Sequence, residues 1–310
     1  VEKYHSLEAY QQLDVLVSAK RFDVIQAESL HMAEYALRLK EKYHIPIILR
    51  EHNFQAEIIK RYAETVQNPV LKFYLQFNYK KMLHYEAATV TKFDKVLTVS
   101  ETDDVKLHSI APGVKSTVIP AGVDCEQYYY QLPSFKPAVV FLLNYEWLPN
   151  IDAFRYYFSE IFPLLQAKMP QIQTIVVGRS TEKIPKEFWK EGLVFKGFVE
   201  DFNSIATFAP VAIMPLRIGG GMRIKLVELM AKGMAIVSTS VGAEGVTVQD
   251  GENILIADSP EDFVEAVLKL LNSPDECIRI GKNARKLVEE CYSWNIIGDK
   301  LFHTLQSVIC

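Results

Sequence analysis

The residues best suited to chemistry surround three consecutive glycines, Gly219-Gly220-Gly221, which separate an apolar run from a helical stretch. Glycines let a backbone approach an anion closely, and a helix start presents unpaired N–H groups and a partial positive charge. Met222 ends the turn, and Arg223 and Lys225 stand where they add positive charge. The pattern predicts a site for a phosphate or pyrophosphate group.

Glu228 lies about two turns into the expected helix, where a carboxylate can accept paired hydrogen bonds from the vicinal hydroxyls of a ribose. The alternative is structural: the glycines form a plain turn, and Glu228 pairs with Lys225 three residues earlier. Gly-rich turns between a strand and a helix are common, so this pattern alone does not decide between the two.

Short β-branched runs alternate with helical stretches, and they predict the elements that must position this site. Runs that are apolar on both faces are typical of a parallel sheet covered on both sides. A first series lies at 22–27, 45–49, 95–100 and 117–119, and a second at 138–143, 174–177, 193–195, 211–214, 235–238 and 254–257. We expect an α/β protein with two Rossmann-like, doubly wound parallel-sheet domains.

The segment 124–137 holds three consecutive tyrosines, two prolines and no clear periodicity, so we expect an interdomain linker with its tyrosines packed locally. The expected domains are 1–130 and 131–292, followed by a terminal helix at 293–310. Prolines at positions 260 and 274 suit the first turns of two further helices. Because no strand followed by a Gly-rich turn precedes residue 22, the first domain is expected to lack its first strands.

Composition excludes several classes of protein. A chain of 310 residues with 49% hydrophobic content can bury two cores, and a net charge of −4 with scattered Lys and Arg argues against a nucleic-acid partner. The apolar runs are far shorter than the roughly 20 residues that span a bilayer, and the first six residues do not resemble a targeting signal. The widely spaced cysteines indicate free thiols in a reducing, cytoplasmic setting; they are Cys125, Cys277, Cys291 and Cys310.

The run 211–246 resembles the donor-binding segment of the retaining glycosyltransferases of family 4 (group 1), which have the GT-B fold. Within this run, 233–237 and 242–246 follow the expected helix and share in the resemblance. Other segments resemble the family in the same order along nearly the whole chain: 51–53 (Glu-His-Asn), 99–101, 119–124, 147–150, 177–178 and 197–199. The resemblance implies two domains that face a cleft, with the terminal helix crossing back to the first domain.

The resemblance also implies roles for residues of the turn. Glu228 matches the second Glu of the family's Glu-x7-Glu motif, which contacts the nucleotide ribose, whereas the first Glu falls on Gly220. The basic residues that often follow the first strand of the family's second domain are absent from 144–150. Arg223 and Lys225 are therefore the candidates to neutralise the diphosphate.

Four further residues are candidates at lower specificity. His52 matches a family position that faces the cleft, where it would bind the donor or position the acceptor, although a lone His after a strand is often structural. Ser100 is a candidate phosphate ligand, yet an N-cap for the helix that follows is the commoner use of such a serine. Phe198 and Val199 lie where the family holds the base.

The implied reaction moves a hexosyl-type group from a nucleotide-diphosphate sugar, of the UDP or GDP type, to an acceptor hydroxyl with retention, in glycan or polysaccharide biosynthesis. No cofactor or metal is expected where turn amides, the helix dipole, Arg223 and Lys225 stabilise the departing diphosphate. The acceptor is a glycan, a lipid-linked glycan or a small molecule. A lipid-linked acceptor implies peripheral contact with the inner face of the membrane, which no strongly basic amphipathic helix in the sequence indicates.

Two alternatives remain open on the sequence. A nucleotide-sugar 2-epimerase has the same fold and a similar donor site, and a nucleotide-sugar binding module without turnover would suit a shortened first domain. A dinucleotide-dependent dehydrogenase is disfavoured, because no G-x-G-x-x-G follows any expected strand.

Overall fold

The computed structural model describes residues 6–309. The expectation that the first six residues are not a targeting signal therefore concerns five residues outside it, and the expected free thiol of Cys310 also lies outside it. The chain forms two compact units. The first contains the chain up to Ala121, the short stretch Gly220–Met222 and the chain from Ile297 onwards; the second contains Gly122–Gly219 and Arg223–Ile296.

The first unit is built on a four-stranded parallel sheet in the order β1-β2-β3-β4. Its strands are β1 (Ile25–Glu28), β2 (Ile47–Glu51), β3 (Lys95–Thr98) and β4 (Ser116–Val118). Its helices include α1 (Leu7–Ala19), the 3-10 turn η2 (Leu30–Met32), α2 (Ala33–Tyr43) and α5 (Glu101–Ile110). From Ile297 on, α13 (Trp294–Ile309) packs against buried side chains of β2 and β3, which are Ile48 and Leu97.

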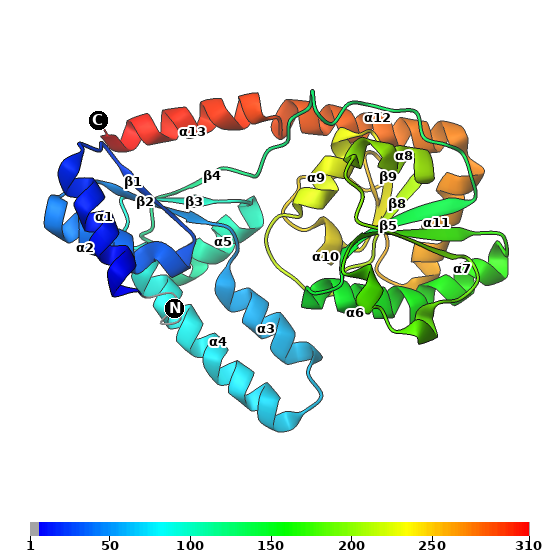
Figure 1. The fold of residues 1–310 in the computed structure, drawn as a ribbon, viewed down its shortest axis with the longest axis horizontal. Helices are drawn as coiled ribbons and strands as arrows, with labels where there is room; N and C mark the ends of the chain where they lie inside the picture. Colours follow the sequence, from blue (N-terminus) through cyan, green and yellow to red (C-terminus); the bar gives the residue numbers. More distant parts are fainter. Residues whose placement is uncertain (1–5, 310) are drawn as a thin grey trace. The chain divides into compact units, whose positions relative to one another are not determined.

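Two helices of the first unit form a hairpin that extends away from its sheet, α3 (Gln55–Thr65) and α4 (Pro69–Val90) (Figure 1). The start of α4 follows from its sequence. Asn68 caps the helix by accepting hydrogen bonds from the N–H groups of Val70 and Leu71, and Pro69 occupies the first turn, where its missing N–H costs nothing.

The second unit is built on a six-stranded parallel sheet in the order β10-β9-β8-β5-β6-β7. The strands are β5 (Ala138–Asn144), β6 (Gln173–Arg179), β7 (Leu193–Gly197), β8 (Val211–Met214), β9 (Ala235–Ser238) and β10 (Leu255–Ile256). Every residue of β8 and β9 is buried, as expected for central strands covered on both faces. All ten expected strands are present, which confirms the two-sheet α/β fold class.

Several of the remaining helices pack on this second sheet. The helices α6 and α8 contact β5, α11 contacts both β8 and β9, and α12 contacts β9. Their bounds are α6 (Leu148–Tyr156), α7 (Phe162–Lys168), α8 (Ile205–Phe208), α9 (Ile224–Ala231), α10 (Ser240–Ala243), α11 (Pro260–Asn272) and α12 (Pro274–Cys291). Shorter turns are the π-helical η3 (Tyr157–Ile161) and the 3-10 turns η4 (Thr181–Lys183), η5 (Lys186–Phe188) and η6 (Phe202–Ser204). The expected helix starts at Pro260 and Pro274 are confirmed, each preceded by a serine whose side chain caps the helix.

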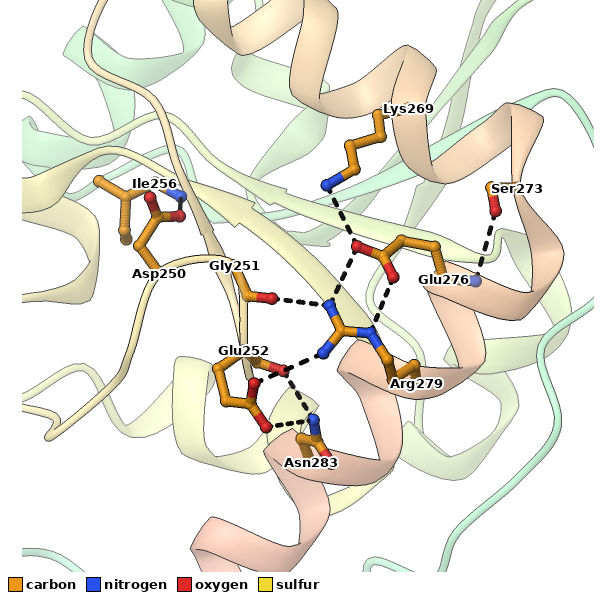
Figure 2. Close-up of polar contacts among 9 residues, drawn as sticks. All are labelled: Asp250, Gly251, Glu252, Ile256, Lys269, Ser273, Glu276, Arg279 and Asn283. Atoms are coloured by element: carbon orange, nitrogen blue, oxygen red, sulfur yellow. Dashed lines mark hydrogen bonds and ion pairs between the residues drawn. The ribbon is translucent and has the colours of Figure 1, made fainter.

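A polar network joins α11 and α12 to the loop before β10 (Figure 2). The guanidinium of Arg279 donates to the carboxylate of Glu276 and to the backbone oxygen of Gly251, and it lies 3.5 Å from the carboxylate of Glu252. Lys269 reaches Glu276 at 3.1 Å. The two basic groups lower the pKa of Glu276 to about 2.

Cys125, Cys277 and Cys291 are free thiols, as expected. Within residues 6–309, no helix has both the length and the apolar character needed to cross a bilayer.

Candidate functional site

The turn between β8 and α9 lies at the carboxyl end of a central strand of the second sheet. Gly219 has φ 141° and Gly221 has φ 70°, which are values that residues with a side chain rarely adopt. A Cβ at position 219 would also collide with the guanidinium of Arg223. Gly219 and Gly221 are therefore required by the backbone path, and Gly219 also leaves room for a cationic side chain.

Arg223 stands immediately before α9, and only 7% of its surface is exposed. Its guanidinium carbon lies 5.7 Å from the ring centroid of Trp147. The residue thus places a largely buried positive charge at a helix N-terminus, where the backbone N–H groups also favour an anion.

Glu228 faces into the second unit from α9 and is 9% exposed. One carboxylate oxygen lies 2.6 Å from the Lys225 amine, and the other accepts a hydrogen bond of 3.2 Å from the Tyr128 hydroxyl. The ion pair expected under the structural alternative is therefore present. This ion pair leaves acceptor capacity on the carboxylate, because its two oxygens offer about four lone-pair sites for hydrogen bonds.

Tyr128 is a contact that the sequence did not indicate, because 100 positions separate it from Glu228. Burial and the nearby carboxylate raise the pKa of Tyr128 above its ordinary value, so its hydroxyl remains a donor. The Lys225 amine lies 4.7 Å from the ring centroid of Phe202, whose ring packs edge-on against Tyr128. Two aromatic rings thus flank the Lys225–Glu228 pair.

The segment around Tyr128 is held in place by Arg285 of α12. The guanidinium donates to the backbone oxygens of Tyr128, Ala231 and, at 2.8 Å, Cys125. Beside it, the buried amine of Lys232 donates to the Asn203 side chain at 2.7 Å, and burial lowers the pKa of Lys232 to about 8. The expected linker is therefore fastened to the end of α9 that carries Glu228.

Phe198 and Val199 follow β7 at the carboxyl edge of the same sheet. Gly197, with φ 67°, turns the chain there. Phe198 is 61% exposed, and the guanidinium of Arg179 lies 5.3 Å from its ring centroid, whereas Val199 is partly buried. The exposed ring is available to a flat ligand, and Arg179 was not indicated by the sequence.

In the first unit, His52 follows β2 and its Nε2 lies 2.9 Å from a carboxylate oxygen of Glu28, the last residue of β1. About half of the His52 side chain is exposed. Glu28 is the partner that the sequence did not identify, although Glu28 ends β1 and His52 directly follows β2, the neighbouring parallel strand.

Two buried carboxyl groups lie beside His52 in the first unit. Glu51 is 4% exposed, and Glu86 of α4 is fully buried and accepts the N–H groups of Gln55 and Ala56 at 2.8 and 3.1 Å. Burial raises the pKa of Glu86 to about 7. Burial, together with the charges of Glu86 and Asp103, raises the pKa of Glu51 well above its ordinary value.

Ser100 is the N-cap of α5, which is the commoner of the two roles expected for it. Its hydroxyl accepts the Asp103 N–H at 3.0 Å and donates to the Asp103 carboxylate at 2.8 Å. That expectation is confirmed, and any role of Ser100 as a phosphate ligand stays a prediction.

The structure thus gathers the candidate residues in two places. The second unit brings Gly219, Arg223, Lys225 and Glu228 together around one turn, with Phe198 and Val199 at the same sheet edge. The first unit holds His52 and Ser100 at the ends of β2 and β3, and it includes Gly220, Gly221 and Met222. Within the described part of the chain, no three His, Cys, Asp or Glu residues are grouped as metal ligands.

Comparisons with known proteins add the family. Residues 136–273 match the family model described as glycosyl transferases group 1, and residues 2–127 match the model of glycosyltransferase family 4. A relative from Klebsiella pneumoniae, described as an uncharacterized 44.6 kDa protein in the cps region, is 22% identical over 91% of this chain and 74% of its own length.

A second relative is the GDP-mannose-dependent monoacylated alpha-(1-6)-phosphatidylinositol monomannoside mannosyltransferase of Corynebacterium glutamicum, 28% identical over 47% of this chain and 42% of its own. Among solved structures, Anabaena Alr3699/HepE in complex with UDP superimposes with a TM-score of 0.76 at 16% identity, over 95% of this chain and 81% of that one. The likeness in structure extends over both units and agrees with the two family models. The chain belongs to the family 4, or group 1, glycosyltransferases and has their GT-B fold.

Proposed function

We propose that this glycosyltransferase binds the diphosphate of a nucleotide sugar at the turn between β8 and α9, and that Glu228 binds the ribose. The observation that carries the proposal is the largely buried Arg223 at the start of α9, five residues before the inward-facing Glu228. A buried cation and a helix N-terminus favour an anion, and a carboxylate farther along the same helix favours hydroxyl groups.

In the proposed reaction, the bond between the anomeric carbon and the diphosphate oxygen breaks, and the acceptor oxygen bonds to that carbon with retention. The proton of the acceptor hydroxyl passes to the departing diphosphate. Negative charge grows on the departing diphosphate. The turn amides and Arg223 are fixed before the reaction, so they stabilise this charge without reorganising. Lys225, whose side chain is 59% exposed, can move from Glu228 to the diphosphate.

We assign residues 131–292 to donor binding. Residues 1–130, with His52 near the acceptor, are assigned to the choice of acceptor. The first boundary between the two compact units along the chain lies between Ala121 and Gly122. The donor is of the UDP or GDP type. The Anabaena structure supports the first and the Corynebacterium relative the second. The latter's named substrate also supports a glycan on a lipid as the acceptor.

Calorimetry without added metal tests the donor site, with UDP, GDP, ADP and NAD as ligands. We expect one nucleoside diphosphate to bind preferentially, and Glu228→Ala to weaken it about 10- to 150-fold, because charged hydrogen bonds of about 1.5 to 3 kcal/mol are lost. Glu187→Ala, which removes an exposed carboxylate of the same unit, should leave the affinity unchanged. Equal affinity of the wild type and Glu228→Ala would refute the ribose contact.

A further inference from the structure

The hairpin of α3 and α4 exposes an apolar stripe. Val70, Phe73, Tyr74 and Phe77 are 78, 73, 60 and 57% exposed. Their spacing of three, four and seven residues puts them on one face of α4. At 1.5 Å per residue the stripe is about 10 Å long. Three large aromatic side chains in one exposed stripe are not accounted for by the core of the first unit.

Positive charge surrounds this stripe. Between Pro69 and Tyr85 the sequence has three lysines, Lys72, Lys80 and Lys81, and neither Asp nor Glu. All three lysines are exposed, and the amine of Lys81 lies 5.7 Å from the ring centroid of Phe77. The rest of the chain compensates, since the net charge of the protein is −4. The local charge is therefore opposite in sign to that of the whole protein.

A groove of about 450 Å³ between the two helices adjoins the stripe. Its lining combines the rings of Phe73 and Phe77 with the amines of Lys60 and Lys80 and with one carboxylate, that of Glu64. An apolar floor beneath amines suits a ligand with an acyl chain below an anionic headgroup.

We propose that the α3–α4 hairpin docks on a bilayer that carries anionic lipid. Exposed aromatic residues flanked by lysines are suited to the boundary between headgroups and acyl chains, where a helix buries its apolar face by about 5 to 10 Å. The lysines then lie at the level of the anionic headgroups. Charge complementarity favours this partner over a second copy of the chain, whose matching stripe would bring lysines against lysines. The proposal concerns the hairpin alone and does not depend on the nucleotide site.

Cosedimentation of the full chain with vesicles tests the proposal, using phosphatidylcholine alone and phosphatidylcholine mixed with phosphatidylglycerol. We expect binding only to the mixed vesicles, weakened by salt. Phe73→Ser with Phe77→Ser should weaken binding about tenfold or more through lost apolar burial. Lys72→Gln, Lys80→Gln and Lys81→Gln together should weaken it on the order of 100-fold, at about fivefold per lysine.

Two control variants remove the same number of aromatic rings, or the same number of lysine charges, from other parts of the surface. Phe135→Ser with Phe302→Ser removes two rings that are 46 and 58% exposed elsewhere, and Lys282→Gln, Lys286→Gln and Lys300→Gln remove three exposed amines from α12 and α13. Both should bind vesicles like the wild type, and every variant should bind nucleoside diphosphate like the wild type.

Three results would overturn the proposal: no binding of the wild type to the mixed vesicles, equal losses in the hairpin and control variants, or self-association that the double Phe variant abolishes without any vesicle binding. The last result would assign the stripe to a second copy of the chain. Failure of nucleotide binding with intact vesicle binding would instead count against the donor site.

Discussion

Glu228 and Glu86 are both buried carboxylates, yet their surroundings suit them to different tasks. Glu228 accepts from the Lys225 amine and the Tyr128 hydroxyl, two side-chain donors that a ligand hydroxyl can join or replace. Glu86 accepts from two backbone N–H groups at the start of α3, which are fixed by the helix. The first arrangement suits binding, and the second holds the loop that carries His52 against α4.

The raised pKa of Glu86 predicts a pH-dependent stability. Its carboxyl binds a proton more tightly in the folded state, where its pKa is about 7, than in the unfolded state, where it is about 4.5. The free energy of unfolding should therefore fall by about 3 kcal/mol as pH rises from 4.5 through 7, a range in which the folded state binds more protons. In Glu86→Gln this fall should shrink, and urea unfolding across that pH range measures it.

The exposed Glu41 of α2 provides the control, because Glu41→Gln should leave the pH dependence unchanged. Glu51 continues to titrate in the Gln variant, so a residual slope is expected. A slope identical to that of the wild type would contradict the account of Glu86.

At the scale of elements, the packing of α12 against the turn that follows α9 depends on two glycines. A Cβ at Gly281 would collide with the backbone oxygen of Gly233. Alanine favours a helix over glycine by about 1 kcal/mol, but the collision with backbone cannot be relieved by a rotamer change. We expect Gly281→Ala to destabilise the protein by about 1 to 3 kcal/mol in urea unfolding.

Gly298 of α13 is the matched control, since nothing lies within 4 Å of a Cβ built there. Gly298→Ala should therefore stabilise the protein by up to about 1 kcal/mol, through helix propensity alone. Opposite signs of the two stability changes would separate the effect of packing from that of helix propensity. Stabilisation by both substitutions would show that α12 can shift away from Gly233.

The network on α12 predicts a second effect at this scale. Arg279→Ala removes the donor to Glu276 and Gly251, and we expect only a small loss of stability at neutral pH, since the side chains are exposed and screened. The pKa of Glu276 is depressed to about 2, so the interaction is present above about pH 4.5 and is lost as pH falls towards 2.

Urea unfolding of Arg279→Ala at neutral pH and near pH 3 measures this loss. The difference from the wild type should be smaller at the lower pH. Lys286→Ala, whose amine lies 3.9 Å from Glu290 and is 73% exposed, should change the stability little at either pH. A loss in Arg279→Ala that is independent of pH would point to packing of the arginine stem instead.

The sequence predicted those features that depend on residues close together along the chain. Central strands such as Val211–Met214 are apolar at every position, and Pro260 and Pro274 mark helix starts by local chemistry. The contacts of Arg285 with Tyr128 and of Glu86 with Gln55 were not predicted, because they join segments far apart in sequence whose proximity only the folded chain decides.

The sequence also could not predict which side chains of α4 are exposed to solvent, for a related reason. A helical stretch was expected between the second and third strands, but its apolar and aromatic residues occur on all sides, so the sequence does not tell a core face from a solvent face. Only the position of α3 settles which rings are covered. Phe73 and Phe77 are consequently exposed although their residue type is typical of a core.

At the scale of the whole molecule, the α9 residues of the donor site, Arg223 to Glu228, and the hairpin stripe belong to different units, which predicts that their ligands act separately. We expect a nucleoside diphosphate to slow amide hydrogen exchange in 211–231 and around Tyr128, and to leave 66–77 unchanged. Anionic vesicles should do the reverse. Each ligand stabilises only the structure that it binds, by about 2.7 kcal/mol at 100 times its dissociation constant.

Hydrogen exchange of the full chain, followed by mass spectrometry with each ligand alone and with both, measures this separation. Glu228→Ala should lose only the protection by nucleotide, and the triple lysine variant of α4 only the protection by vesicles. If nucleotide also protected the hairpin, or vesicles the donor turn, the two units would be coupled. The affinity for nucleotide would then have to rise by the same factor when vesicles are bound, because coupling between two binding sites is reciprocal.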